Sequence, residues 1–115
     1  MIYTAAGGSG QGTIEAAVES EAWALGVDSD QFLTATEEQQ GHILTSMLKR
    51  VDNSVFAVAE AASNGEFTSG TVVLDLSTDG VGYSTEGGYL DEFVDQLEDL
   101  KAQIIAGDIE VPTAP

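Results

Sequence analysis

Two stretches of the chain repeat apolar residues at the spacing of an amphipathic helix. Over residues 90–105 the apolar positions alternate with acidic ones, so one helix face is apolar and the opposite face is charged. Gly107 follows, and glycine is common just beyond a helix end. The same spacing over residues 51–62 predicts a second helix, which residues 64–65 (Asn-Gly) close.

The N-terminal pattern predicts a strand, a glycine turn and a helix. Residues 2–5 are β-prone and run into glycines, and Ser9 is a residue type that caps helices. We therefore expect a helix over about residues 10–20. The side chains expected on its inner face are Ile14, Ala17 and Val18.

Three further apolar runs predict strands. Residues 22–27 (AWALGV) are continuously apolar between acidic residues, which is typical of a strand buried on both faces of a parallel sheet. Residues 43–48 and residues 71–76 are the other two predicted strands. Residues 28–41 are polar and irregular, and residues 79–82 are expected to form a loop.

The predicted order is strand, helix, strand, strand, helix, strand, helix. This alternation is typical of an α/β fold, here a partial doubly wound, largely parallel sheet with helices on both faces. In such sheets ligands bind beyond the carboxyl ends of the strands. The 115 residues suffice for one domain, which we place at residues 1–111, with residues 112–115 as a surface tail.

The strongly negative charge of the chain restricts the classes of molecule that it can bind. The chain has 20 acidic residues against 3 basic ones, a net charge of −17, and 43% hydrophobic residues. The apolar content predicts a folded protein, and the lack of a basic patch excludes nucleic acid as a partner. The acids are spread without a long run, which favours adaptation to high salt over a specific acidic tail or a cation-binding surface.

Cysteine and long apolar runs are both missing from the sequence. Without cysteine there is no disulfide, no zinc–thiolate site and no cysteine nucleophile. No apolar run approaches the ~20 residues of a membrane span. The N-terminus carries neither a basic region nor a hydrophobic stretch of signal-peptide length. We therefore expect this sequence to contain no export signal and no lipid-attachment cysteine.

Gly7 and Gly8 lie in the predicted turn between strand and helix, where backbone N–H groups can bind a polar ligand. The pattern is not a dinucleotide fingerprint, because the third glycine position is Thr13. It is not a phosphate P-loop either, because no Gly-Lys-Ser/Thr follows. A tight turn without a ligand explains the glycines equally well, so both interpretations stay open.

Asp28 and Asp30 follow the buried strand. A carboxylate at this place can accept hydrogen bonds from both hydroxyls of a vicinal diol, such as the 2′ and 3′ hydroxyls of ribose. A metal site is a rival interpretation, but the neighbourhood offers no histidine and no third acid, which leaves too few ligands. The simpler alternative is a pair of solvated aspartates that cap a helix or form a turn.

Lys49 and Arg50 are two of only three basic residues, and they lie where a strand ends and a helix begins. The helix dipole disfavours cations there, so helix stability does not explain them. We expect one to contact a ligand and the other to form a buried ion pair; structural pairing of both is the alternative. The possible acidic partners are Asp28, Asp30 and Asp52. The third basic residue, Lys101, follows acids on a helix face, where charge pairing is a sufficient account.

The sequence offers no set of catalytic residues. His42 is the only histidine, and no serine has the context of a nucleophile elbow. We therefore expect no catalytic residue, no metal and no cofactor. Among the aromatic residues Trp23 is expected in the core, whereas Phe32 and Tyr83 are placed in loops and stay open as residues that stack on a ligand base.

Several segments, in this order, resemble a known family. Residues 4–10 (TAAGGSG), 23–31 (WALGVDSDQ) and 43–59 (ILTSMLKRVDNSVFAVA), then a VVLDL strand and a GVGYS loop, look like the C-terminal region of the basic-membrane-protein (BMP) family. These are the purine-nucleoside-receptor-like (PnrA-like) substrate-binding lipoproteins of ABC transporters. The resemblance runs from about residue 2 to residue 111. GVDSDQ and SMLKRVD are its most distinctive parts.

The resemblance implies a two-lobed periplasmic-binding-protein fold of type I, in which a nucleoside binds between the lobes. The implied ribose contacts are Gly7, Gly8, Asp28 and Lys49. The implied supporting residues are Asp30, Arg50 and Asp52, the last two as neighbours that hold Lys49. The base-stacking residues of the family lie largely in the N-terminal lobe, which this sequence lacks.

On this resemblance the chain is a partial C-terminal lobe, a fragment of an ABC-transporter substrate-binding protein for purine nucleosides or related small solutes, and not an enzyme. The expected partners are the solute, the N-terminal lobe and the ABC permease. The alternative is a freestanding interaction or regulatory domain that reuses the lobe without transport. Family members are exported and anchored to the membrane by a lipid, so the location of a chain without signal or anchor stays open.

Overall fold

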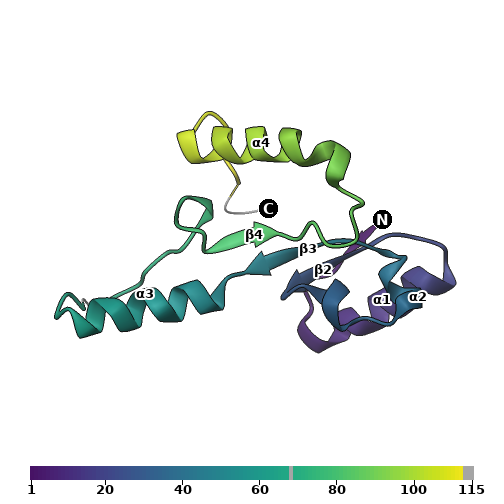
Figure 1. Cartoon of the computed structure of the whole chain (residues 1–115), viewed down its shortest axis with the longest axis horizontal. Helices are drawn as coiled ribbons and strands as arrows, with labels where there is room; N and C mark the ends of the chain where they lie inside the picture. Colours follow the sequence, from purple (N-terminus) through teal and green to yellow (C-terminus); the bar gives the residue numbers. More distant parts are fainter. Residues whose placement is uncertain (68, 113–115) are drawn as a thin grey trace.

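The computed structural model describes residues 1–67 and 69–112 (Figure 1). The strands are β1 (Ile2–Tyr3), β2 (Ala24–Asp28), β3 (Ile43–Lys49) and β4 (Val81–Tyr83). The α-helices are α1 (Gly10–Glu19), α2 (Glu37–Gln40), α3 (Val51–Ser63) and α4 (Val94–Ala106). Short 3-10 helices are η1 (Gly7–Ser9), η2 (Gln31–Thr34), η3 (Leu76–Thr78) and η4 (Asp91–Phe93). Of the expected tail, residues 113–115 lie outside the described residues.

The strands form one sheet in the order β1-β2-β3-β4. β1 pairs with β2, and β2 with β3, in parallel, whereas β4 pairs with β3 antiparallel. The expected largely parallel α/β architecture is therefore confirmed, with one antiparallel edge strand. Parallel neighbours require a crossover, and α1 supplies it between β1 and β2.

The core lies between α1 and the centre of the sheet. Successive turns of α1 bury Ile14 and Ala17 against β2 and β3, as the apolar spacing predicted. The buried cluster consists of Ile14, Ala17, Ala24 and Ile43, with Ala22, Phe32 and Ala35 packed against it. Val18, also expected on the inner face, is half-buried. Ser9 precedes α1 as predicted, but its side chain makes no capping hydrogen bond.

The placement of Trp23 in the core was wrong. Its side chain is 36% exposed, and it lies just before β2 with an edge-to-face contact to Tyr89, the ring centroids 4.8 Å apart. An apolar run does not show which of its residues lie inside the strand and which precede it. The large indole is accommodated at the rim, where only part of it needs to be buried.

The fourth strand is not where the sequence placed it. Residues 71–75 are not in a strand, and Val72 and Val73 are 63% and 75% exposed. The edge strand is instead β4, inside the region expected to be a loop. Strand formation needs a neighbouring edge with unpaired backbone groups, and β3 offers that edge to residues 81–83.

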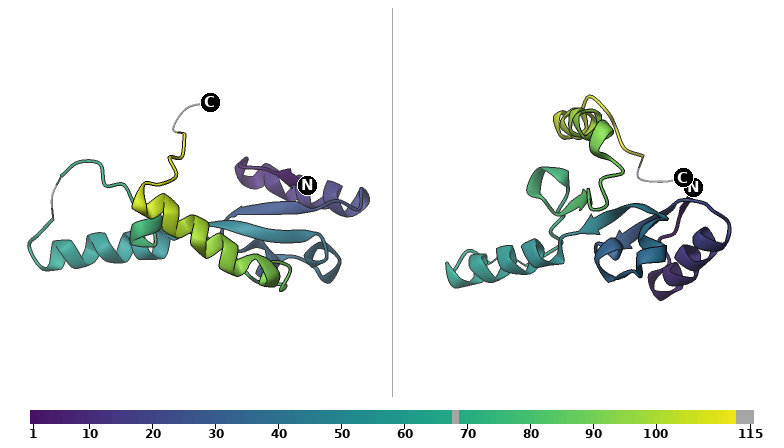
Figure 2. Two further views of the ribbon diagram at one scale, coloured as in Figure 1. Left: turned by 90° about the horizontal axis from the view of Figure 1, so that it is seen from above. Right: turned by 45° about the vertical axis from the view of Figure 1, so that its right-hand side comes forward.

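Two long helices extend away from this core (Figures 1 and 2). α3 continues from the end of β3 and projects outward, and none of its residues is buried. α4 lies on the far side of β4 from α1 and α2, and its apolar side is half-buried at best. Both predicted helix ends are confirmed: Asn64 follows α3, and Gly107, with φ 83°, follows α4 in the left-handed conformation.

Candidate functional site

The candidate site lies at the edge of the sheet where the three parallel strands end. Because these strands run in the same direction, their carboxyl ends meet at one edge. β1 ends at Tyr3 and leads to the glycine turn, β2 ends at Asp28, and β3 ends at Lys49. Tyr3 is a half-exposed aromatic residue at this edge, which the sequence reasoning did not single out.

Asp28 and Lys49 are brought together across β2 and β3. Lys49 Nζ lies 2.7 Å from Asp28 Oδ1, and the two side chains remain 56% and 53% exposed. The hydrogen bond from the ammonium to the carboxylate, with its charge, raises the pKa of Lys49 above its ordinary value. Two opposite charges thus lie side by side and open to solvent, where a polar ligand can reach both.

The backbone of Asp28 adopts an unusual conformation. Its φ is +74°, in the left-handed region that residues other than glycine rarely occupy. The next residue turns back at once, since Ser29 N donates to Val27 O at 3.0 Å. Backbone strain of this kind is concentrated at functional sites, where the surrounding structure holds it in place.

Asp30 fixes the loop that follows Asp28. Its carboxylate accepts hydrogen bonds from Phe32 N at 3.1 Å and from Ser84 Oγ at 2.5 Å. Ser84 is nearly buried, and its carbonyl accepts a hydrogen bond from Thr45 Oγ1 at 2.6 Å. The loop is therefore bonded to β3 and to the residue after β4. Asp30 thus bonds the loop to Ser84 and pairs with neither basic residue, and its supporting role at a binding site stays a prediction.

A second hydrogen bond, which attaches the loop to β3, explains why residue 26 is glycine. Gln31 N donates to the buried Ser46 Oγ at 3.1 Å, between β2 and the loop. A Cβ atom on Gly26 would collide with Ser46 Oγ and crowd Gln31 Cβ at 3.1 Å. Glycine is required here by close packing rather than by its φ. Ser46 and Ser84 could not have been selected from sequence, because only the strand register places them beside the loop.

Arg50 and Asp52 form a separate pair. Arg50 Nε donates to Asp52 Oδ1 at 3.1 Å and Nη2 donates to Oδ2 at 2.9 Å, with both residues exposed. These hydrogen bonds raise the pKa of Arg50 and lower the pKa of Asp52. The expectation of a buried ion pair was wrong, and so was the idea that these residues hold Lys49. Arg50 is the N-cap residue of α3 and Asp52 lies in its first turn, so the two side chains meet locally at the start of the helix.

The glycine turn contributes backbone rather than side chains. Gly7 and Gly8 form the start of η1, and Gly7 has φ +55°, which favours glycine. Among the described residues beyond the chain neighbours, no atom lies within 4 Å of a Cβ built on either glycine. Local packing therefore does not demand glycine at position 8. The turn leaves open space at the same edge as Asp28 and Lys49.

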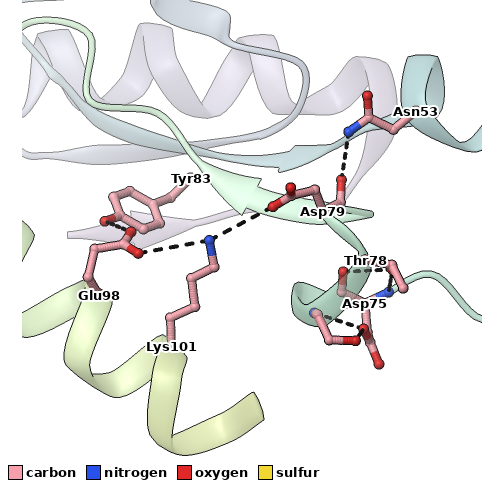
Figure 3. Close-up of polar contacts among 8 residues, drawn as sticks. Asn53, Asp75, Thr78, Asp79, Tyr83, Glu98 and Lys101 are labelled. Atoms are coloured by element: carbon pink, nitrogen blue, oxygen red, sulfur yellow. Dashed lines mark hydrogen bonds and ion pairs between the residues drawn. The ribbon is translucent and has the colours of Figure 1, made fainter.

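Phe32 and Tyr83, whose role in stacking on a ligand base was left open, do not lie at the edge of the sheet where the parallel strands end. Phe32 lies in η2 and packs against the core, and Tyr83 lies in β4. The Tyr83 hydroxyl donates to Glu98 Oε1 at 2.7 Å, and burial together with this carboxylate raises the pKa of the phenol (Figure 3). Both side chains are thus engaged within the chain.

A cavity of about 390 Å³ separates β3 and β4 from α4. Its charged lining is already paired: Lys101 Nζ lies 3.9 Å from both Asp79 Oδ1 and Glu98 Oε2 (Figure 3). The expected charge pairing of Lys101 is therefore confirmed. Neither Asp28 nor Lys49 lines this cavity, so it is distinct from the strand-end site.

Residues 1–114 match the family described as ABC transporter substrate-binding protein PnrA-like, or Bmp. The chain belongs to this family. The resemblance seen in the glycine turn, GVDSDQ and SMLKRVD is thus confirmed over nearly the whole sequence. Across the described residues, no helix of this family member is both long and apolar enough to cross a membrane.

Two relatives match the whole chain or nearly all of it. The chain is 35% identical to a CD4+ T-cell-stimulating antigen of Listeria monocytogenes, over 100% of the chain and 36% of that protein. It is 32% identical to the ABC transporter nucleoside-binding protein BmpA of Lactococcus lactis, over 98% of the chain and 36% of that protein. The chain thus spans about a third of the length of these relatives.

Two solved structures share the fold. A transcriptional activator of the comK gene from Bacillus halodurans is 26% identical, with a TM-score of 0.75 over 90% of the chain and 35% of that structure. An ABC transporter solute-binding protein from Aeropyrum pernix is 25% identical, with a TM-score of 0.68 over 97% of the chain and 40% of that structure. In both cases the chain matches only part of a larger protein.

Proposed function

We propose that this chain supplies the sugar-binding side of a nucleoside site in an ABC-transporter substrate-binding protein. The observation that carries the proposal is the Asp28–Lys49 pair, 2.7 Å apart and half-exposed at the strand ends. Asp28 is held there in a strained backbone conformation, and its loop is bonded to β3 and to Ser84. A strained and firmly supported carboxylate is a feature of binding sites.

The chemistry of the pair fits a vicinal diol. The carboxylate of Asp28 accepts hydrogen bonds from two neighbouring hydroxyls, and the ammonium of Lys49 donates to their oxygens. Without a ligand the two groups satisfy each other. A ribose that enters exchanges this single ion pair for a larger set of charge-assisted hydrogen bonds. The open turn at Gly7 and Gly8 leaves room for the sugar to approach.

The ligand class rests on this chemistry together with one relative. The Lactococcus lactis protein is named as nucleoside-binding, and the 32% identity covers 98% of this chain. The role is binding rather than catalysis, in line with a family of substrate-binding proteins. On this proposal residues 1–111 form a partial C-terminal lobe. The base-binding side of the site and the contact with an ABC permease involve other polypeptide segments.

The test is a titration of the ¹⁵N-labelled chain with inosine, followed by amide chemical shifts. The proposal predicts weak binding with shifts at Asp28, Lys49 and the glycine turn, and no response to 2′,3′-dideoxyinosine, which lacks both hydroxyls. Asp28→Ala abolishes the response because it removes the charged acceptor. Asp52→Ala, which breaks the other exposed ion pair, is the matched control and leaves it unchanged.

Two results contradict the proposal. One is an equal response to inosine and its dideoxy analogue, which means that the diol is not recognised. The other is an inosine response that survives Asp28→Ala.

A further inference from the structure

The edge strand β4 contacts both halves of the candidate site. At its start Val81 pairs with Lys49, which carries the positive charge of the site. Just after its end Ser84 bonds to the loop that follows Asp28, which carries the negative charge. β4 runs beside β3 between these two points (Figure 1). The strand therefore joins the backbone of Lys49 to the loop of Asp28.

The start of β4 is held against the end of β3. Arg50 N donates to Gly80 O at 2.9 Å, directly beyond Lys49. A side chain adds a second bond, since Asn53 Nδ2 donates to Asp79 O at 3.0 Å (Figure 3). These two bonds fix the register of β4 beside Lys49, so the strand cannot slide along β3 without breaking them.

Ser84 is held firmly at the other end of β4. Ser84 N donates to Ser46 O at 2.9 Å, and Thr45 Oγ1 donates to Ser84 O at 2.6 Å. The Ser84 hydroxyl donates to Asp30 Oδ2 at 2.5 Å and accepts from Glu86 N at 3.0 Å. The bond to Asp30 has the short length of a charge-assisted hydrogen bond. A hydroxyl that both donates and accepts within the protein is fixed in direction.

The buried polar side chains in the described part of the chain both bond to the loop after Asp28. They are Ser46 and Ser84, which are 0% and 5% exposed. Ser46 Oγ accepts from Gln31 N, and Ser84 Oγ donates to Asp30. A buried hydroxyl adds little net stability, because it exchanges hydrogen bonds to water for hydrogen bonds to protein. The position that they give to Asp28 explains these two serines better than stability does.

The loop bonds surround a residue whose own backbone conformation is unfavourable. Asp28 has φ +74°, and a residue in this region keeps such a conformation only when its surroundings hold it. Asp30 lies two residues further along the chain. Its Oδ1 accepts from Phe32 N and its Oδ2 from Ser84 Oγ, so both oxygens are engaged within the protein. Asp28 is thus the carboxylate that faces solvent at the strand ends.

From these contacts we propose that Ser84 is a positioning residue of the ligand site. Through Asp30 it holds the carboxylate of Asp28 in the conformation that meets Lys49 and the ligand. β4 acts as a brace, because the same strand fixes Lys49 at its start and leads to Ser84 at its end. This inference rests on the proposed function and deepens it by naming what sets the geometry of that site.

The test compares Ser84→Ala with the unmodified chain in two NMR measurements. The first needs no ligand, because the backbone chemical shifts and scalar couplings of Asp28 report its φ. The positive φ is expected to be lost or averaged over several conformations once the loop is released. The second is the inosine titration, in which Kd is expected to rise about tenfold, the usual effect of one lost hydrogen bond.

Ala17→Gly is the matched control for a general loss of stability. Ala17 is fully buried in α1 and takes part in none of the hydrogen bonds of the loop. Glycine removes a buried methyl group and weakens the helix, so the melting temperature falls by several degrees, as it does in Ser84→Ala. The control is expected to keep the positive φ of Asp28 and to change the Kd for inosine by less than about twofold.

Asp30→Ala removes the other partner of the same hydrogen bond. It is expected to release Asp28 as Ser84→Ala does, so it gives a result even where Ser84→Ala does not fold. The double variant is expected to bind inosine as Asp30→Ala does, because the two side chains act through one contact.

Four results overturn the inference. They are a φ of Asp28 that is unchanged in both Ser84→Ala and Asp30→Ala, the same loss of that φ in Ala17→Gly, an unchanged Kd despite an altered φ, and a double variant that binds much more weakly than either single variant. If the loop is released as expected but the unmodified chain gives no inosine response, the proposed function alone is contradicted.

Discussion

Lys49 Nζ and Asp28 Oδ1 lie 2.7 Å apart at the carboxyl ends of two neighbouring parallel strands. The register that pairs Asp28 with Leu48 in the sheet places the two side chains within reach. Neither residue is buried, so this ion pair contributes little to stability. A substitution in this pair can therefore change ligand binding without destabilising the fold.

Asp28→Asn is expected to abolish the inosine response while leaving the fold unchanged. Asparagine tolerates the left-handed conformation that Asp28 adopts, so no strain is added. The exposed ion pair with Lys49 is lost, and the melting temperature should change by no more than about 2 °C. Differential scanning fluorimetry measures stability and an inosine titration measures binding. A large fall in melting temperature would show that Asp28 serves the fold instead.

Gly26→Ala is expected to destabilise the fold by about 1–3 kcal/mol, the usual result of overpacking a core. The new methyl group collides with Ser46 Oγ and crowds Gln31. Urea unfolding followed by circular dichroism provides the measurement. Gly12→Ala is the control: among the described residues, no atom beyond its chain neighbours and its own helix backbone lies within 4 Å of a Cβ at Gly12, and alanine favours the helix by up to about 1 kcal/mol. Equal effects of the two substitutions would rule out close packing at Gly26.

Acid is expected to weaken the contacts at the start of α3 and at the start of η3. The Arg50 guanidinium and the N–H of Asn53 lower the pKa of Asp52, and the hydroxyl and N–H of Ser77 lower the pKa of Asp75. A pKa lowered in the folded state means that the ionised carboxylate stabilises the fold above the ordinary value of about 4. This stabilisation is lost as the pH falls through the folded-state pKa.

The side-chain carboxyl signals of both aspartates, followed by NMR in molar salt, are expected to titrate with midpoints below about 4. Molar salt is used because it screens the general repulsion among acids. Ser77→Ala should raise the midpoint of Asp75 and leave that of Asp52 in place. Midpoints at or above about 4 in the unmodified chain would show that the two carboxylates lack these contacts in solution.

Salt is expected to raise the melting temperature steeply. The net charge of −17 repels itself at low salt, and the repulsion is screened when the Debye length falls to a few ångströms. A series of melting curves from about 0.05 M to about 2 M NaCl provides the measurement. A flat response would favour a specific acidic function over adaptation to a salt-rich environment.

Local sequence patterns were sufficient to predict the elements whose hydrogen bonds lie within the element itself. The apolar spacing of residues 51–62 and 90–105 predicted α3 and α4 with their ends, since helices bond within themselves. The apolar runs at β2 and β3 were also found. Because parallel strands end at one edge, the sequence placed Asp28 and Lys49 at the same edge of the sheet, but Asp28 was only one of three candidate partners of the basic residues until the structure showed the ion pair.

Only the tertiary structure decided which segment forms the fourth strand and which contacts hold the site loop. Residues 71–76 have better strand composition than β4, yet a strand exists only where another edge accepts its hydrogen bonds, and here β3 accepts β4. The bond from Ser84 to Asp30 joins residues 54 positions apart and follows from that pairing. The sequence by itself thus determined α1, α3 and α4, the central strands and the family, but not α2, which lies in a region expected to be irregular. Long-range pairing determined the edge strand and the support of Asp28.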